Sequence, residues 1–106
     1  MLFILDQKGN TYSERGGHVH YGGNGVYVDD RALLSFEAYG DVQKDIFNRV
    51  CRVGDLYIYY NNLGNVFRIG DAEIYYDNFD RISRVNDLQI YYNNLDRLHR
   101  IGDDYF

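Results

Sequence analysis

The chain has 106 residues, of which 45% are hydrophobic and 25% are charged, and its formal net charge at pH 7 is −5. This composition is typical of one globular domain, and the acidic balance argues against nucleic acid or an anionic membrane as the partner. The single cysteine, Cys51, excludes an internal disulfide, and the first residues lack the basic segment of a signal peptide. We therefore expect a cytoplasmic protein. The alternative is a secreted protein that has lost its leader.

The first 40 residues are expected to form short hairpins. Residues 3–15 predict a hairpin with a turn at 7–10, and residues 18–21 and 26–28 predict two strands on either side of a glycine-rich turn. The hairpins would either cap the rest of the chain or represent an eroded form of it.

The next apolar run, residues 32–39, fits two readings. Asp30 is a suitable cap for a short helix there, but the apolar side chains also alternate as in a strand. We favour the strand, because a glycine-aspartate pair follows at 40–41 and the same pair closes later units.

The remainder of the chain repeats itself with a period of sixteen residues. Three copies follow one another, DLYIYYNNLGNVFRIG at 55–70, DAEIYYDNFDRISRVN at 71–86 and DLQIYYNNLDRLHRIG at 87–102, and a shorter, degenerate copy covers 41–54. Self-similarity at a fixed period indicates a repeat architecture. We expect residues 1–106 to form one domain, with 1–40 as the degenerate or capping hairpins and 41–106 as the repeat region.

Turn chemistry predicts how each copy folds. The glycine-aspartate pairs suit two-residue hairpin turns, which place Ile58 opposite Ile69 and place Arg68 between Tyr59 and Glu73. The twelve tyrosines also favour strands. We predict an all-β fold, an antiparallel β-meander of tyrosine-rich 16-residue hairpin repeats that forms a curled sheet, an open barrel or a sandwich. The alternative is a β-solenoid, which would stack equivalent arginines about 4.8 Å apart and is disfavoured by charge repulsion.

Strand alternation assigns the side chains to two faces. The apolar face, expected to be the core, carries Leu56, Ile58, Tyr60, Phe67, Ile69, Ala72, Ile74, Tyr76, Val85, Leu88, Ile90, Tyr92 and Ile101. The other face, expected to be solvated, carries Tyr57, Tyr59, Arg68, Glu73, Tyr75, Arg84, Gln89, Tyr91 and Arg100. Cys51 and His99 occupy the position of Phe67 and are assigned to the core side. Val66, Ile82 and Leu98 break the alternation, and we expect them to cluster over the loops with Leu63, Phe79 and Leu95.

The pattern IYYDNFDRISRV resembles the tyrosine-rich YD repeats of RHS-type proteins. Tyr75, Tyr76, Asp77, Arg81 and Ile82 carry the likeness, which covers residues 41–106. The unit here is shorter, and an aspartate stands where the YD repeat has a glycine before the arginine. The resemblance implies a β-hairpin scaffold and no particular activity.

A histidine pair is the strongest metal signal in the chain. His18 and His20 project from the same face of a strand, but the glutamate that a cupin site would need a few residues later is absent. We expect no metal and no cofactor, and keep a small metal-dependent enzyme that uses this pair as a second alternative.

The tyrosine-arginine face is the candidate binding surface. It consists of Tyr59, Tyr75, Tyr91, Arg68, Arg84 and Arg100. Aromatic residues with arginine are typical of recognition surfaces. We therefore expect a non-enzymatic scaffold or protein-interaction module, with a carbohydrate-binding module as the first alternative. The alternative is a purely structural role, in which these residues stiffen a solvated sheet through cation–π pairs and bind nothing.

The last residues begin another copy. Tyr105 and Phe106 are costly to leave in water, so we expect them to pack on the strand at 3–5 and close the sheet as a monomer. The alternative is a dimer through this edge.

Overall fold

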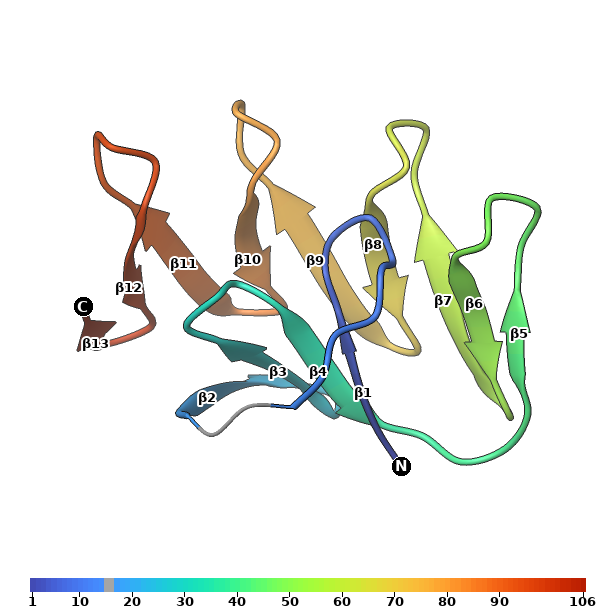
Figure 1. Cartoon of the computed structure of the whole chain (residues 1–106). Helices are drawn as coiled ribbons and strands as arrows, with labels where there is room; N and C mark the ends of the chain where they lie inside the picture. The colour runs from blue at the N-terminus through green and yellow to red at the C-terminus, as the bar shows by residue number, and fades with distance from the viewer. Residues whose placement is uncertain (15–16) are drawn as a thin grey trace.

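The computed structural model describes residues 1–14 and 17–106, and within them the chain forms two antiparallel sheets and no helix (Figure 1). The four-stranded sheet has the order β1-β4-β3-β2 and consists of β1 (Leu2–Leu5), β2 (Val19–Gly23), β3 (Val26–Asp29) and β4 (Leu34–Glu37). The nine-stranded sheet runs in chain order and consists of β5 (Val42–Lys44), β6 (Val50–Val53), β7 (Leu56–Tyr60), β8 (Val66–Ile69), β9 (Ala72–Tyr76), β10 (Ile82–Val85), β11 (Leu88–Tyr92), β12 (Leu98–Ile101) and β13 (Asp104–Tyr105). The all-β prediction is confirmed, and so is the strand in place of a short helix at 32–39.

The meander is built as the turn chemistry predicts. Ile58 lies opposite Ile69, and Arg68 lies opposite Tyr59 on one side and Glu73 on the other. Each strand pairs with the next one in the chain, so the β-solenoid alternative is wrong. The sheet curls behind the four-stranded sheet, and the two do not form a closed barrel (Figure 1).

A β-bulge in each hairpin corrects the predicted faces. Tyr59 pairs with Arg68 but Tyr60 pairs with Val66, so Phe67 is an extra residue without a partner opposite. The same register shift leaves Cys51, Ser83 and His99 as the extra residues of the other hairpins. Because two successive residues of a bulged strand oppose one residue of its partner, the alternation of faces slips by one there.

The bulges change which side chains are buried. Val66 and Ile82 enter the core, whereas Phe67 is 40% exposed on the opposite side of the sheet. The assignment of Phe67 to the core was therefore wrong, and the same holds for His99, which is exposed, and for Cys51, which is only half-buried. Leu63, Phe79 and Leu95 do not cluster with the buried residues either, because they stand at exposed loop tips.

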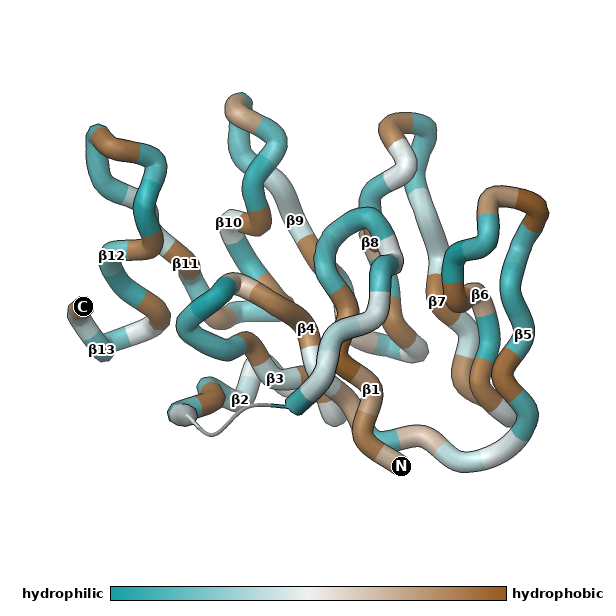
Figure 2. The backbone as a smooth tube through the Cα atoms, viewed as in Figure 1, coloured by the Kyte–Doolittle hydropathy of each residue, from teal (hydrophilic) through white to brown (hydrophobic). Residues whose placement is uncertain are grey.

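The core lies between the two sheets (Figure 2). Val26, Val28, Leu34 and Phe36 from the four-stranded sheet belong to the same buried cluster as Ile58, Ile74 and Ile90 from the nine-stranded sheet. The face of the nine-stranded sheet that carries these isoleucines is called the inner face here, and the opposite one the outer face. Burial of about 25 cal/mol per Å² of apolar surface makes this shared cluster the main source of stability.

The four-stranded sheet docks where the repeats depart from their common pattern. Asn86 replaces the turn glycine of the other copies, and its amide donates to the carbonyls of Gly22 and Gly23 at 2.9 Å each. Gly22 permits this approach of β2, because a Cβ there would lie 2.7 Å from Cγ1 of Val85. Asn65 replaces the loop arginine of the other copies and is fully buried, beneath the turn that contains Gln7.

The two ends of the chain pair differently from the prediction. Thr11 returns to Leu5 through a single bridge, while the main partner of β1 is β4; position 15 of the predicted hairpin lies outside the described residues. β13 pairs with β12 as the last strand of the nine-stranded sheet, so Tyr105 and Phe106 do not pack on β1 and the predicted closure is wrong. The Phe106 ring instead meets His20 of β2 edge-on, with centroids 6.1 Å apart.

Candidate functional site

The predicted tyrosine-arginine face forms as a continuous outer surface of the nine-stranded sheet. Tyr59, Tyr75 and Tyr91 are 41%, 37% and 40% exposed. They stand on β7, β9 and β11, and the strand between each pair carries an arginine. Because neighbouring strands lie about 4.8 Å apart, the tyrosine rows repeat about every 10 Å across the sheet.

Each arginine of this face lies over a tyrosine ring of the neighbouring strand. The guanidinium carbon is 5.3 Å from the ring centroid for Arg68 and Tyr59, 4.0 Å for Arg84 and Tyr75, and 4.7 Å for Arg100 and Tyr91. Such cation–π pairs stabilise exposed sheets by about 0.5–1 kcal/mol.

Hydrogen bonds fix the guanidinium groups further. Nε of Arg68 donates to the carbonyl of Gly70 at 2.7 Å, and Arg52 and Arg100 make the same bond to Gly54 and Gly102. The Tyr75 hydroxyl donates to the Glu73 carboxylate, and this hydrogen bond raises the pKa of Tyr75 above its ordinary value. The surface is therefore held in one arrangement before any partner arrives.

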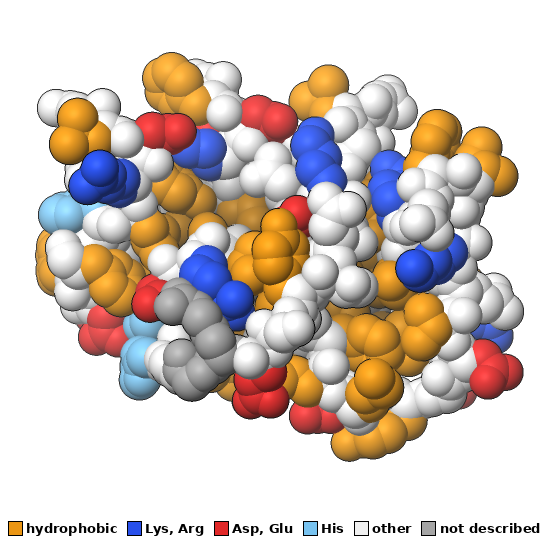
Figure 3. All heavy atoms as spheres, in the orientation of Figure 1, with side chains coloured by type: hydrophobic (Ala, Val, Ile, Leu, Met, Phe, Trp, Pro, Cys, Tyr) orange, Lys and Arg blue, Asp and Glu red, His pale blue; other side chains and the backbone are white. Residues whose placement is uncertain are grey.

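The loop tips form a second exposed surface, which the sequence analysis missed. Phe47, Leu63, Phe79 and Leu95 are 69%, 70%, 76% and 72% exposed, at the tips of the four longer loops of the nine-stranded sheet. All four loops lie along one edge of the nine-stranded sheet (Figure 1), where the space-filling view shows apolar side chains at separate loop tips (Figure 3). The signal was present in the sequence, because an apolar residue recurs at the centre of a polar loop in every copy.

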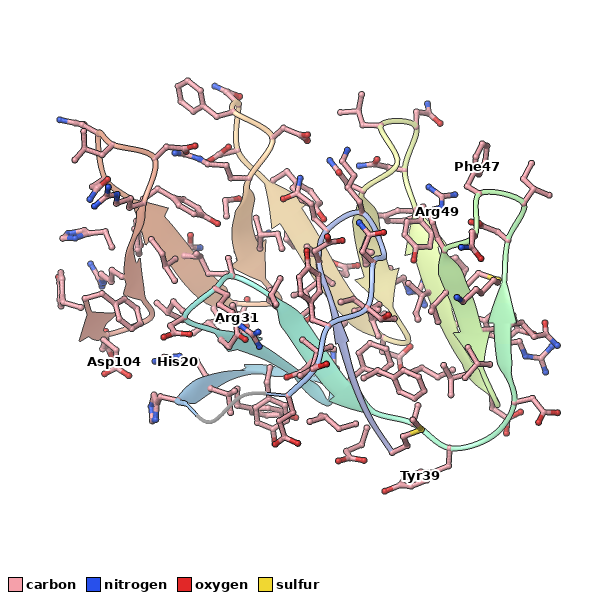
Figure 4. The ribbon with its side chains drawn as sticks, in the orientation of Figure 1. His20, Arg31, Tyr39, Phe47, Arg49 and Asp104 are labelled. Atoms are coloured by element: carbon pink, nitrogen blue, oxygen red, sulfur yellow. The ribbon has the colours of Figure 1, made fainter. Side chains whose placement is uncertain are left out.

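Each of these loops is cross-linked by the side chain of its first residue, an aspartate or asparagine that accepts two backbone amides of the loop. In the first of them, Oδ1 of Asp45 accepts the amides of Phe47 and Arg49 at 2.9 and 3.1 Å, and its other oxygen forms an ion pair with Arg49. The ion pair and the two amide bonds lower the pKa of Asp45 against the effect of its desolvation. Phe47 lies at the tip of the loop (Figure 4), and the Arg49 guanidinium lies between two rings, 4.9 Å from the Phe47 centroid and 4.0 Å from the Tyr60 centroid.

A hollow of about 450 Å³ lies over the outer side of the four-stranded sheet. It is lined by Ile4, Tyr27, Glu37 and neighbouring residues of that sheet, and by Asp29 and Arg31 at its rim. Asp29 and Arg31 form an ion pair of 2.7 Å with each other. The hollow is therefore concave and lined by more acidic than basic side chains, since Glu14, Asp30 and Glu37 also line it.

The remaining predicted residues lie at three separate places in the structure. His18 and His20 lie together, with ring centroids 4.7 Å apart, at the edge of the four-stranded sheet. His99 lies far along the chain from them and packs edge-on against Tyr105, with centroids 5.7 Å apart. Cys51 donates weakly to the carbonyl of Gln43 at 3.5 Å.

Comparison with known proteins returned no match to a family model, to a curated protein or to a solved structure. Among the described residues there is no helix with the length and hydropathy needed to cross a membrane.

Proposed function

We propose that this chain is a non-enzymatic interaction module that binds another protein through the outer face of the nine-stranded sheet. The observation that carries the proposal is the row of half-exposed tyrosines on β7, β9 and β11, each paired with an arginine of the next strand. Tyrosine and arginine are enriched among the residues that dominate binding energy at protein interfaces.

The arrangement favours binding because little freedom remains to be lost. Ordering a flexible side chain at an interface costs about 0.5–1.5 kcal/mol, and stacking on a tyrosine together with a carbonyl hydrogen bond already orders Arg68 and Arg100. The guanidinium groups keep further N–H donors for a partner. The surface therefore suits a protein that offers carboxylate or carbonyl oxygens to the arginines and apolar atoms to the tyrosine edges.

A carbohydrate partner is the second candidate. Tyr57 and Tyr59 stack nearly parallel, with an interplanar angle of 24° and centroids 6.3 Å apart, which resembles a platform for sugar rings. However, Arg52 lies over the Tyr57 ring at 5.0 Å and Arg68 over the Tyr59 ring at 5.3 Å. A sugar would need the ring faces that the arginines cover, so a protein partner fits the geometry better.

The test compares two triple variants of surface residues. The wild-type chain is used to capture a partner from host cells, and the purified partner is then titrated by calorimetry against each variant. Replacing Tyr59, Tyr75 and Tyr91 with serine is expected to weaken binding tenfold or more, because exposed anchors are lost while the core is untouched.

The matched control replaces the exposed loop-tip residues Leu63, Phe79 and Leu95 with serine, and we expect it to bind like the wild type. Loss of binding in the loop variant alone would move the interface to the loop tips. Binding on a glycan array that the tyrosine variant abolishes would instead favour the carbohydrate function.

A further inference from the structure

The two sheets meet at a cluster of three side chains that can hold a metal ion. His20 lies opposite Val28 on the neighbouring strand, and Val28 is fully buried, so His20 also faces the nine-stranded sheet. His18 lies just before β2, and its ring lies edge-on to that of His20, with centroids 4.7 Å apart. The His20 side chain is only 10% exposed, whereas that of His18 is 76% exposed.

The third side chain comes from the other end of the chain. Asp104 on β13 lies opposite Ile101, whose side chain is buried, and this register turns the carboxylate toward β2. Its Oδ2 lies 2.7 Å from Nε2 of His20 and 3.8 Å from Nε2 of His18. Figure 4 shows His20 and Asp104 side by side where β2 approaches β13. The three ligand atoms all lie within 4.8 Å of one another.

We propose that His18, His20 and Asp104 form a binding site for a divalent metal ion of the zinc type, and that Zn²⁺ is the preferred ion. Two imidazole nitrogens and one carboxylate oxygen suit zinc and its neighbours, whereas Ca²⁺ and Mg²⁺ prefer oxygen ligands. Zinc–ligand bonds of about 2.1 Å at tetrahedral angles require ligand atoms about 3.4 Å apart. The distances of 2.7 and 3.8 Å lie on either side of that value, so small side-chain rotations suffice.

Metal binding replaces the hydrogen bond between His20 and Asp104. Nε2 of His20 must be unprotonated to bind the ion, so the neutral ring then carries its one proton on Nδ1, and the lone pairs of Nε2 and the carboxylate are free for the metal. Nδ1 of His20 is buried without a hydrogen-bond partner among the described groups, so the support that usually orients a ligating histidine is missing. We therefore expect a site of moderate rather than very high affinity, open to solvent on the His18 side.

The site has a structural consequence that does not depend on the proposed binding partner. His18 and His20 belong to the edge of the four-stranded sheet, and Asp104 to the last strand of the nine-stranded sheet. An ion bound by all three joins the sheets at a position where the structure shows side-chain contact but no strand pairing. Since a ligand that binds only the folded chain stabilises it, the metal raises the unfolding temperature.

The experiment titrates Zn²⁺ into the full chain after treatment with EDTA and removal of the chelator. We expect one ion per chain by calorimetry and, with excess Zn²⁺, a rise of about 5 °C or more in the unfolding temperature. His18→Ala is the decisive variant, because this exposed ring can be removed without loss of core contacts. It should weaken Zn²⁺ binding at least tenfold and remove the temperature shift. Asp104→Asn should do the same.

The matched control is His99→Ala, which removes the third histidine of the chain and should leave both measurements unchanged. Co²⁺ provides a second readout, since the visible absorption of a four-coordinate Co²⁺ complex should appear with the wild type and with His99→Ala but not with His18→Ala. The proposal is overturned if His18→Ala binds Zn²⁺ as tightly as the wild type. It is equally overturned if His99→Ala abolishes binding, or if the stoichiometry shows only nonspecific uptake.

Discussion

Each full repeat carries two adjacent tyrosines whose side chains lie on opposite faces of the sheet. The first, at Tyr59, Tyr75 and Tyr91, belongs to the outer surface. The second is half-buried and donates its hydroxyl to a carbonyl of the preceding strand. These bonds join Tyr60 to Val50 at 2.6 Å, Tyr76 to Val66 at 2.5 Å and Tyr92 to Ile82 at 2.8 Å. Neighbouring repeats pair their strands only next to the two-residue turns. The inner tyrosines add a hydrogen bond between the same two strands at the end away from that turn.

Replacing Tyr76 with phenylalanine should cost about 1–3 kcal/mol of unfolding free energy, because the carbonyl of Val66 loses its buried donor. The matched control is Tyr75→Phe in the same strand, whose hydroxyl bonds Glu73 at the exposed surface. That change should cost less than about 0.5 kcal/mol. Urea denaturation measures both, and equal costs would contradict the assignment of the two tyrosines to different faces.

The inner tyrosines also make the fold sensitive to alkali. Burial is the main cause that raises the pKa of Tyr60 and of Tyr92 from 10.0 to about 12, and it raises that of Tyr76 still further. Between pH 10 and pH 12 these tyrosines are ionised in the unfolded chain but still protonated in the folded chain. Their contribution to the free energy of unfolding is therefore complete below pH 10 and is lost as the pH rises toward 12. Absorbance at 295 nm should show these tyrosines ionising later than the exposed ones. A titration in which all tyrosines ionise together near pH 10 while the chain stays folded would contradict this.

At the scale of the strand, the pairing could be predicted from sequence and the bulge was missed. The glycine-aspartate turns fix the register of the strands. For this reason Tyr59 and Glu73 were correctly predicted to lie opposite Arg68. Val66 and Ile82, which break the alternation of apolar and polar side chains along their strands, were the signal for the bulge. Val66 precedes Ile69 by three residues, and two residues at an odd spacing face the same side only if a bulge lies between them.

The departures from the repeat were the other element-scale signal. When the copies are aligned, Asn65 and Asn86 resemble random divergence between repeats. Both, however, bind the N-terminal part of the chain: Asn65 the turn at Gln7, and Asn86 the strand β2. The sequence could not assign them, because the pairing of β1 with β4 and the docking of β2 depend on packing between distant segments. The same is true of Asp104, which lies 84 residues from His20 along the chain.

Asn86 permits a test in which matching the repeat should weaken the fold. Asn86→Gly restores the residue found at the equivalent turns and relieves a positive φ of 50°, but it removes two bonds to β2 and one from the amide of Glu73. We expect a loss of about 1–3 kcal/mol. Asn86→Asp keeps the acceptor and loses the donors, so it should be at least as destabilising. An Asn86→Gly chain more stable than the wild type in urea would show that the docking bonds contribute little.

At the scale of the whole molecule, the two sheets share one core and neither covers its own apolar face. The nine-stranded sheet has its inner face against the four-stranded sheet, and the buried cluster runs through both without a boundary (Figure 2). A domain of this size with one core usually unfolds in a single cooperative transition. The division between residues 1–40 and 41–106 in the sequence is therefore not expected to appear as two unfolding steps.

Paired truncations test this coupling. Leu34 in β4 and Ile74 in β9 are 0% and 3% exposed, and changing either to alanine should cost about 2–5 kcal/mol. Both variants should shift one common urea transition, with circular dichroism and tyrosine fluorescence coincident, because each side chain packs into the same cluster. Phe67→Ala is the control: it deletes a larger side chain, but the bulge places that side chain on the outer face, so the cost should stay below about 1 kcal/mol. If Leu34→Ala produced an early partial transition while Ile74→Ala left that step unchanged, the sheets would be separate folding units. In that case the nine-stranded sheet would stay folded without the four-stranded sheet covering its apolar inner face.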